Sequence, residues 1–220
     1  MRHCVANKRF MDFCVVSDLA SLVWLAQLAT IEMHTSLSLG GAMEQPQFLV
    51  FDLDPGPPAT IVECCQVGLW VRETFRRDGI ECFAKTSGSK GLQVYVPLNT
   101  PTGYDQTKAV SRALAVELEK RHPDLVVARM AKALRPGKVF IDWSQNDQMK
   151  TTVNVYSLRA RPRPTVSTPV TWEEVEAALR AGDPDLLAFD AAQVLERVEK
   201  HGDLFQPLLE MRQSLPGATD

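Results

Sequence analysis

The segment at residues 47–56 (QFLVFDLDPG) constrains the fold more than any other part of the sequence. Its apolar and strand-favouring residues predict a buried β-strand. Side chains two residues apart on a strand point to the same face, so Asp52 and Asp54 are expected side by side. Pro55 and Gly56 cannot continue the strand, which places the acid pair at its carboxyl end, where α/β sheets usually carry their chemistry.

Two carboxylates held in this way suit a hard divalent cation such as Mg²⁺ or Mn²⁺. The structural alternative is a strand end on the surface that turns at Asp-Pro-Gly, and this segment alone leaves both interpretations open. Residues 138–143 (KVFIDW) form a second apolar strand that ends in a carboxylate, Asp142. Three such acids are enough to hold two divalent ions if they converge.

A loop of two hydroxyls, two glycines and a lysine, SGSKG at residues 87–91, lies between strands predicted at residues 81–86 and 92–98. Its backbone N–H groups could converge on an anion, with Lys90 supplying a positive charge. The loop lacks the spacing of a P-loop and no helix follows it directly, so an ordinary glycine hairpin is the alternative.

The remaining pattern mixes helices with short strands and shows no internal repeat. Ser17 and Asp18 predict the start of a helix that continues to about His34. Apolar periodicity predicts helices at residues 59–77, 104–121, 172–181, 191–201 and 204–214, and strands at residues 125–128 and 151–156. Together these elements predict an α+β fold.

Composition narrows the class of protein. The 220 residues are 45% hydrophobic and 23% charged, as in a soluble globular protein, and the net charge of −3 gives no global sign of nucleic-acid binding. Five cysteines without a CxxC pair favour a reduced cytoplasmic compartment over a disulfide scaffold or zinc site. The longest apolar run is interrupted by polar residues, so no membrane association is expected. Local basic residues are candidate contacts to a phosphate backbone, although a charge run is usually a solvated face: Lys132, Arg135, Arg161 and Arg163.

Four motifs in order closely resemble the polymerase domain of the bacterial end-joining DNA ligase D family, which belongs to the archaeo-eukaryotic primase superfamily. They are FDLDPG at residues 51–56, KTSGSKGL at 85–92, KVFIDWSQN at 138–146 and YSLRAR at 156–161. The phrase LVWLAQLATIEMH at residues 22–34 is similar to the helix that precedes the acid strand in that family. The resemblance runs from about Val15 to Pro216, which is nearly the whole chain.

The resemblance implies one primase-polymerase domain over residues 1–220: a mixed or antiparallel sheet flanked by helices, with a helical tail at residues 170–220. It also implies two-metal nucleotidyl transfer to a primer 3′-hydroxyl, using two Mn²⁺ or Mg²⁺ ions and an NTP or dNTP. The expected setting is DNA end joining or gap filling in the bacterial cytoplasm and nucleoid, with DNA, Ku and a DNA ligase as partners. The metal ligands would be Asp52, Asp54 and Asp142, and the nucleotide contacts His34, Ser87, Lys90, Gln145 and Arg159.

The sequence departs from the family pattern in three places, and two of these departures, Gln93 and the start of the chain, support a second hypothesis. Gln93 stands where the family usually has histidine, and the loop at residues 35–47 is shorter than is common in end-joining members. The chain also begins where the family already has several dozen residues, so an amino-terminally truncated domain is expected. The alternative function is therefore a catalytically silent nucleotide- or DNA-binding module from a truncated or split gene.

Overall fold

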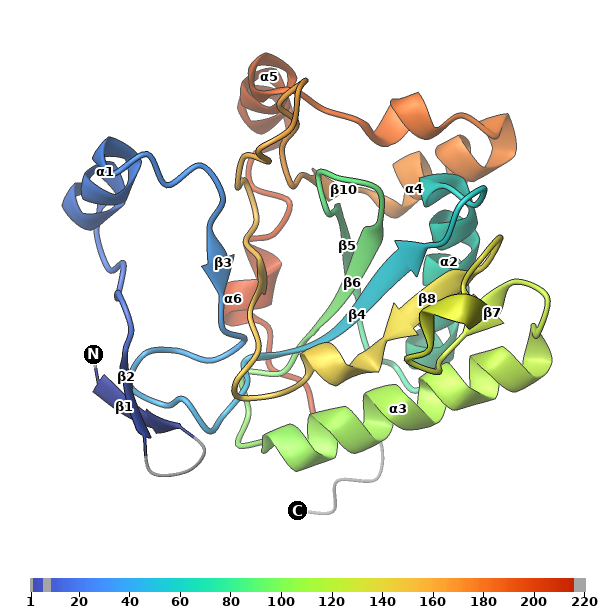
Figure 1. The fold of residues 1–220 in the computed structure, drawn as a ribbon, viewed down its shortest axis with the longest axis horizontal. Helices are drawn as coiled ribbons and strands as arrows, with labels where there is room; N and C mark the ends of the chain where they lie inside the picture. The colour runs from blue at the N-terminus through green and yellow to red at the C-terminus, as the bar shows by residue number, and fades with distance from the viewer. Residues whose placement is uncertain (1, 6–8, 216–220) are drawn as a thin grey trace.

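The computed structural model describes residues 2–5 and 9–215, and it confirms an α+β fold (Figure 1). The strands are β1 (Arg2–Val5), β2 (Arg9–Asp12), β3 (His34–Thr35), β4 (Phe48–Pro55), β5 (Phe83–Thr86), β6 (Leu92–Pro97), β7 (Val126–Val127), β8 (Val139–Asp142), β9 (Thr152–Val153) and β10 (Pro169–Val170). The helices are α1 (Leu19–Gln27), α2 (Ile61–Arg77), α3 (Tyr104–Arg121), α4 (Trp172–Ala181), α5 (Ala191–His201) and α6 (Pro207–Glu210), with 3₁₀ turns η2 (Lys132–Leu134), η3 (Trp143–Gln145) and η4 (Pro184–Leu187).

The centre of the fold is a six-stranded sheet in the order β10-β5-β6-β4-β8-β7. Its strands pair antiparallel except for β7 and β8, which pair parallel. Two smaller ladders pair β1 with β2 and β3 with β9. The prediction of a mixed or antiparallel sheet flanked by helices is therefore confirmed.

The alternation of side chains along β4 separates the two faces of the sheet. Leu49, Phe51 and Leu53 are fully buried in the main core, together with apolar residues of α2, α3 and α4. The intervening side chains, Asp52 and Asp54 among them, point to the opposite face. The helix-covered face thus carries the main core, whereas the opposite face carries a smaller apolar cluster around Val50 and the polar side chains of Asp52 and Asp54.

Local sequence explains the helices that cover the core. Thr60 and Glu63 form a capping box that starts α2, and Thr171 does the same for α4 with Glu174. α2 packs against β4, β6 and β8, and α4 packs on α2. Trp172, the first residue of α4, donates its indole N–H to the carbonyl of Cys82.

Several predicted elements are shorter than the sequence pattern suggested, three of them by the most residues. The helix that starts at Asp18 ends at Gln27, and Ala29 takes a left-handed backbone with φ of 58°. His34 consequently lies on a strand that pairs with β9. The strand predicted at residues 151–156 contains only β9, and the helix predicted at residues 204–214 contains only α6.

α1 stands beside the main sheet, with β1 and β2 below it (Figure 1). Its apolar side chains are largely exposed, including Leu19, Val23 and Trp24. Among the described residues, no helix is both long and apolar enough to cross a membrane.

Candidate functional site

A row of four polar side chains crosses the open face of the sheet. Lys85 on β5 is the register partner of Gln93 on β6, Gln93 is the partner of Asp52 on β4, and Asp52 is the partner of Asp142 on β8. Register partners share a face and lie about 5 Å apart between neighbouring strands. The sheet therefore places one lysine, one amide and two carboxylates in a line perpendicular to the strands.

Asp52 occupies the middle of this row. The side-chain amide of Gln93 donates to its Oδ1 at 3.0 Å and also to Thr152 Oγ1 at 2.8 Å. Burial, followed by the charge of Asp54, raises the pKa of Asp52 to about 6, and the charge of Asp142 adds to this increase. Three carboxylates thus crowd one face with too little positive charge to balance them.

The other two acids have their own partners. Asp142 Oδ1 accepts hydrogen bonds from the backbone N–H of Ser144 at 3.0 Å and from its hydroxyl at 2.5 Å. The amide of Gln145 lies 3.4 Å from Asp142 Oδ2. Asp54 Oδ1 forms an ion pair with Lys90 Nζ at 3.9 Å.

The acid set suits a hard divalent cation, although its side chains are not already gathered as ligands. Within the described part of the chain, no group of three or more His, Cys, Asp or Glu residues is arranged to hold a metal ion. The fit rests on chemistry: Asp52, Asp54 and Asp142 offer only oxygen donors, and a cation would relieve the like-charge repulsion that raises the pKa of Asp52.

The glycine-lysine loop between β5 and β6 is fixed against the acid strand. Ser87 Oγ accepts from the N–H groups of Ser89 at 3.2 Å and Gly91 at 3.1 Å. A Cβ at Gly91 would lie 2.3 Å from the Leu53 carbonyl oxygen, so only glycine allows this approach. Lys90 Nζ donates to the carbonyl of Pro55 at 3.3 Å. The loop therefore presents Lys90 beside the acids.

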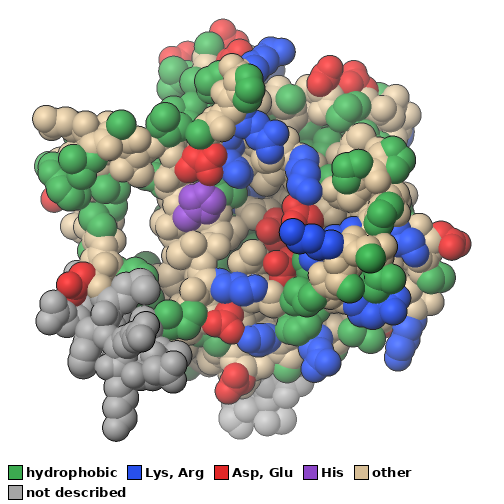
Figure 2. All heavy atoms as spheres, viewed as in Figure 1, with side chains coloured by type: hydrophobic (Ala, Val, Ile, Leu, Met, Phe, Trp, Pro, Cys, Tyr) green, Lys and Arg blue, Asp and Glu red, His purple; other side chains and the backbone are tan. Residues whose placement is uncertain are grey.

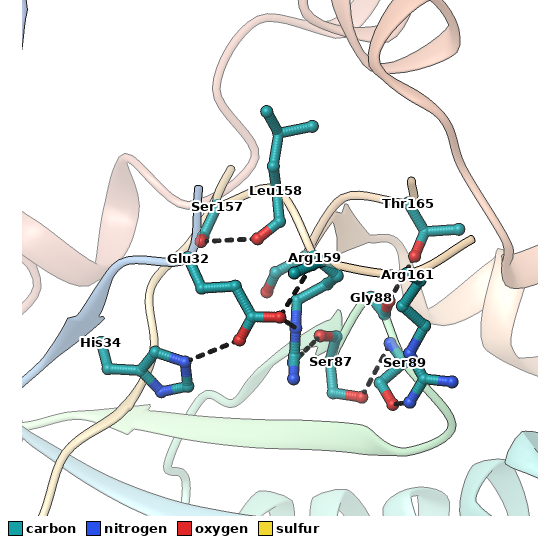
Figure 3. Close-up of polar contacts among 12 residues, drawn as sticks. Glu32, His34, Ser87, Gly88, Ser89, Ser157, Leu158, Arg159, Arg161 and Thr165 are labelled. Carbon is teal, nitrogen blue, oxygen red and sulfur yellow. Dashed lines mark hydrogen bonds and ion pairs between the residues drawn. The ribbon is translucent and has the colours of Figure 1, made fainter. Parts of the chain in front are cut away.

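The third part of the site comes from segments far apart in the sequence. His34 on β3 pairs with Val153 on β9, and Arg159 follows on the same segment as β9. Arg159 Nη1 donates to the Ser87 carbonyl at 2.7 Å. Glu32 lies between the His34 and Arg159 side chains (Figure 3). These contacts bring a histidine and an arginine next to the glycine-lysine loop.

Together these parts line a polar cleft of ≈ 310 Å³. On the face shown in Figure 2, acidic side chains gather near the centre with lysine and arginine side chains around them. Asp142 is adjacent to the cleft as the partner of Asp52. The cleft lining includes seven of the residues singled out from the sequence, namely His34, Asp52, Asp54, Ser87, Lys90, Gln145 and Arg159, together with Ser89, Gln93, Thr151, Thr152 and Val153.

The four basic residues proposed from the sequence to contact DNA lie outside the cleft lining. Lys132 is exposed on η2, and the guanidinium of Arg135, which follows η2, packs 3.7 Å over the ring of Phe140. Arg161 hydrogen-bonds the Ser89 hydroxyl, and Arg163 is exposed on the same loop. Arg161 therefore contacts a residue of the cleft lining, Ser89, without lining the cleft itself.

Two charged residues of the site were not recognised in the sequence. Glu32 is the first. Lys85 is the second: it is fully buried, donates to the Val153 carbonyl at 3.0 Å and to Ser167 Oγ at 2.6 Å, and burial lowers its pKa to about 7. A lysine inside an otherwise apolar strand was the available signal, because lysine is almost never fully buried without partners.

The chain is similar to known proteins over nearly its whole length. The family model described as LigD, primase-polymerase domain, matches residues 3–205. The multifunctional non-homologous end joining protein LigD of Mycolicibacterium smegmatis is 40% identical over 196 residues, which cover 88% of this chain and 25% of that protein. The bifunctional non-homologous end joining protein LigD of Bacillus subtilis is 28% identical over 192 residues, covering 87% of this chain and 30% of that protein.

The fold also matches a solved structure, the polymerase domain from Mycobacterium tuberculosis ligase D in complex with DNA. The TM-score is 0.83 at 37% sequence identity, and the match covers 94% of this chain and 74% of that chain. The chain spans about a quarter of the length of the mycobacterial relatives that it matches. Sequence motifs, sheet topology and the match over residues 3–205 agree, and the chain belongs to the LigD primase-polymerase domain family.

Proposed function

We propose that this chain is a template-dependent nucleotidyltransferase that adds nucleotides to a primer 3′-hydroxyl during end joining or gap filling of bacterial DNA. The observation that carries the proposal is the position of Asp52 and Asp54 beside the glycine-lysine loop in one polar cleft, with Asp142 next to them on the adjacent strand. Carboxylates for cations and basic groups for a triphosphate are the two requirements of phosphoryl transfer. The names of the bacterial relatives and the DNA-bound neighbour support the biological setting.

In this proposal the triphosphate lies across the cleft. Lys90 and Arg159 neutralise charge on the phosphate oxygens, because both are cations that line the cleft. His34 and Ser87 contribute further hydrogen-bond donors, and Gln145 contacts the nucleotide from the side of η3. The glycine-lysine loop is rigidly attached to β4, so the triphosphate is oriented with respect to the acids.

Asp52, Asp54 and Asp142 would hold two divalent ions, Mn²⁺ or Mg²⁺. When bound, such a pair supplies activation of the 3′-hydroxyl and stabilisation of the leaving pyrophosphate. The contribution of the chain is to keep the three carboxylates on adjacent strands of one rigid sheet. Gln93 holds Asp52 in place through its amide.

DNA would approach along the basic residues that flank the cleft. Lys132, Arg135, Arg161 and Arg163 are proposed to contact phosphates, which position the duplex without reading its sequence. The relatives are named as multifunctional end-joining proteins, so Ku and a DNA ligase are proposed as partners, in the bacterial cytoplasm and nucleoid.

Primer extension tests the proposal. The purified chain is incubated with a primer-template, each NTP or dNTP, and Mn²⁺ or Mg²⁺, beside the variants Asp52→Ala and Asp142→Ala. Metal-dependent extension that both substitutions abolish is expected. Extension that survives removal of both carboxylates would contradict the mechanism. Binding of a triphosphate and metal without any extension, even at high Mn²⁺, would instead favour the catalytically silent module.

A further inference from the structure

Glu32 contacts two of the proposed triphosphate ligands and is not itself part of the cleft lining. Its Oε2 accepts a hydrogen bond from His34 Nε2 at 3.0 Å. Its Oε1 accepts the backbone N–H of Ala160 at 2.8 Å and lies 3.2 Å from Arg159 Nε. Figure 3 shows the carboxylate between the imidazole and the guanidinium. One side chain therefore contacts two basic groups from distant parts of the sequence.

The backbone segments that carry these two basic groups are already joined without Glu32. β3 pairs with β9, and Met33 donates its backbone N–H to Ser157 Oγ at 2.8 Å. Glu32 itself contacts the side chains of His34 and Arg159 and the backbone N–H of Ala160. Its main effect is therefore on the orientation of two side chains, because the pairing of the segments has other sources.

Electrostatics exclude a direct contact between Glu32 and an anion. The hydrogen bonds from His34 and Ala160, followed by the charge of the nearby Arg159 guanidinium, lower the pKa of Glu32 to about 2, so it is ionised at neutral pH. An ionised carboxylate repels a phosphate. It can assist anion binding only by holding cationic or hydrogen-bonding groups that themselves reach the ligand.

The geometry of Arg159 shows how this assistance works. Its Nε edge faces Glu32 and its Nη1 donates to the Ser87 carbonyl at 2.7 Å, so two points fix the plane of the guanidinium. The guanidinium has five N–H groups, and those not used by Glu32 and Ser87 remain for a ligand in the cleft that Arg159 lines. His34 is fixed in the same way, because its Nε2 faces Glu32 and its Nδ1 is left for another partner.

We propose that Glu32 is a positioning residue for triphosphate binding, which holds Arg159 and His34 in their binding orientation before the nucleotide arrives. The inference rests on the proposed function of the cleft. Ordering flexible side chains in advance removes part of the entropy loss that binding would otherwise bring. Without Glu32, Arg159 keeps only its hydrogen bond to the Ser87 carbonyl and His34 loses its contact to the carboxylate, so the nucleotide itself must supply more of the ordering.

The test compares the full chain with Glu32→Gln, which keeps the shape of the side chain and removes its charge and one acceptor. Glu176→Gln is the matched control, since Glu176 also lies near two arginines, 3.5 Å from Arg72 and 3.7 Å from Arg180, between α2 and α4. The probes are a nucleoside triphosphate with Mn²⁺ in calorimetry and the same nucleotide in primer extension. Glu32→Gln is expected to raise Kd and KM about tenfold and to change kcat by less than about twofold.

A second readout is independent of catalysis. Nitrogen NMR of the histidine and arginine side chains, without nucleotide, is expected to show one ordered state for His34 and Arg159 in the unsubstituted chain and averaging in Glu32→Gln. An unchanged spectrum, an unchanged Kd, or a loss of kcat at constant KM would each overturn the inference. Loss of the thermal transition in Glu32→Gln would show a structural role and overturn it too. An unsubstituted chain that binds no triphosphate would instead refute the proposed function.

Discussion

Asp52 on β4 and Asp142 on β8 are direct register partners, so two carboxylates face the same side of the sheet on adjacent strands. Like charges in this position destabilise a sheet. Together with burial and the charge of Asp54, this repulsion raises the pKa of Asp52 to about 6. The stability of the chain is therefore reduced at the site proposed to bind metal.

Asp52→Asn is expected to stabilise the metal-free chain at pH 8 by up to about 3 kcal/mol and to abolish primer extension. The folded-state pKa of about 6 lies above the ordinary 3.8, so the folded chain binds this proton more tightly than the unfolded chain. The penalty is complete above about pH 6 and disappears below about pH 4, and the gain from Asn should follow the same window. Urea unfolding of the unsubstituted chain and of Asp52→Asn at pH 4 and pH 8 measures the difference in their free energies of unfolding.

Two comparisons complete this experiment. Asp124→Asn removes an equal charge from an exposed position and should leave stability unchanged at both pH values. Mn²⁺ should raise the Tm of the unsubstituted chain more than that of Asp52→Asn, because only the former retains the full acid set. Equal Tm shifts in the two chains would argue against Asp52 as a metal ligand.

Lys85 gives a second pH dependence of opposite sign. Burial lowers its pKa from 10.5 to about 7, so the folded chain holds this proton less tightly than the unfolded chain. Its unfavourable contribution is complete below about pH 7 and declines as the pH rises towards 10.5. The free energy of unfolding should therefore rise by about 2–3 kcal/mol between pH 7 and pH 9.5 relative to Lys85→Met. Parallel pH profiles in urea would contradict this prediction.

The glycine-lysine loop should tolerate no side chain at two of its positions. A Cβ at Gly91 would lie 2.3 Å from the Leu53 carbonyl oxygen, and Gly88 has φ of +63° with Ser167 N only 2.6 Å from such a Cβ. Gly88→Ala and Gly91→Ala should each lower stability by about 1–3 kcal/mol and weaken triphosphate binding. Gly41→Ala is the control, because no described atom lies within 4 Å of its Cβ position.

Asn146 is fully buried and completes the hydrogen bonding of β4 where β8 has ended. Its side chain accepts from Val50 N at 2.9 Å and donates to Val50 O at 2.8 Å, as a neighbouring strand would. Asn146→Ala leaves both backbone groups without partners and should cost about 2–4 kcal/mol in thermal or urea unfolding. Gln206→Ala, which removes an exposed amide, should change stability by less than about 0.5 kcal/mol.

The sequence was sufficient to predict the elements defined by local patterns. α3, α4 and α5 have the predicted bounds, and the strands that carry the acids are present: β8 ends in Asp142, while β4 continues one residue past Asp54 because Pro55 still pairs with Val139. These elements are predictable because their apolar periodicity lies within each element and their capping residues lie directly at its ends. The acids were recognisable because each follows a run of apolar residues and precedes a turn.

Features that depend on distant contacts could not be predicted. The helix prediction to His34 was wrong because this histidine pairs with Val153, whose contribution no local pattern contains. Glu32 and Lys85 were missed for the same reason, since their partners include Arg159 and Ser167 respectively. The residues proposed to contact a ligand carry sequence signals, whereas the side chains that contact those residues, such as Glu32, are recognised only in three dimensions.

The side-chain amide of Asn146 also fixes the number of residues between Asp142 and Asn146. The chain leaves β8 at Asp142, passes through η3 and returns to Val50, and both ends of this short path are fixed to β4. Insertion or deletion between Asp142 and Asn146 would force the chain to lose either the carboxylate position or the amide bridge. Members of the family that retain both residues should therefore keep this interval constant, while the exposed loop around Arg163 is free to vary in length.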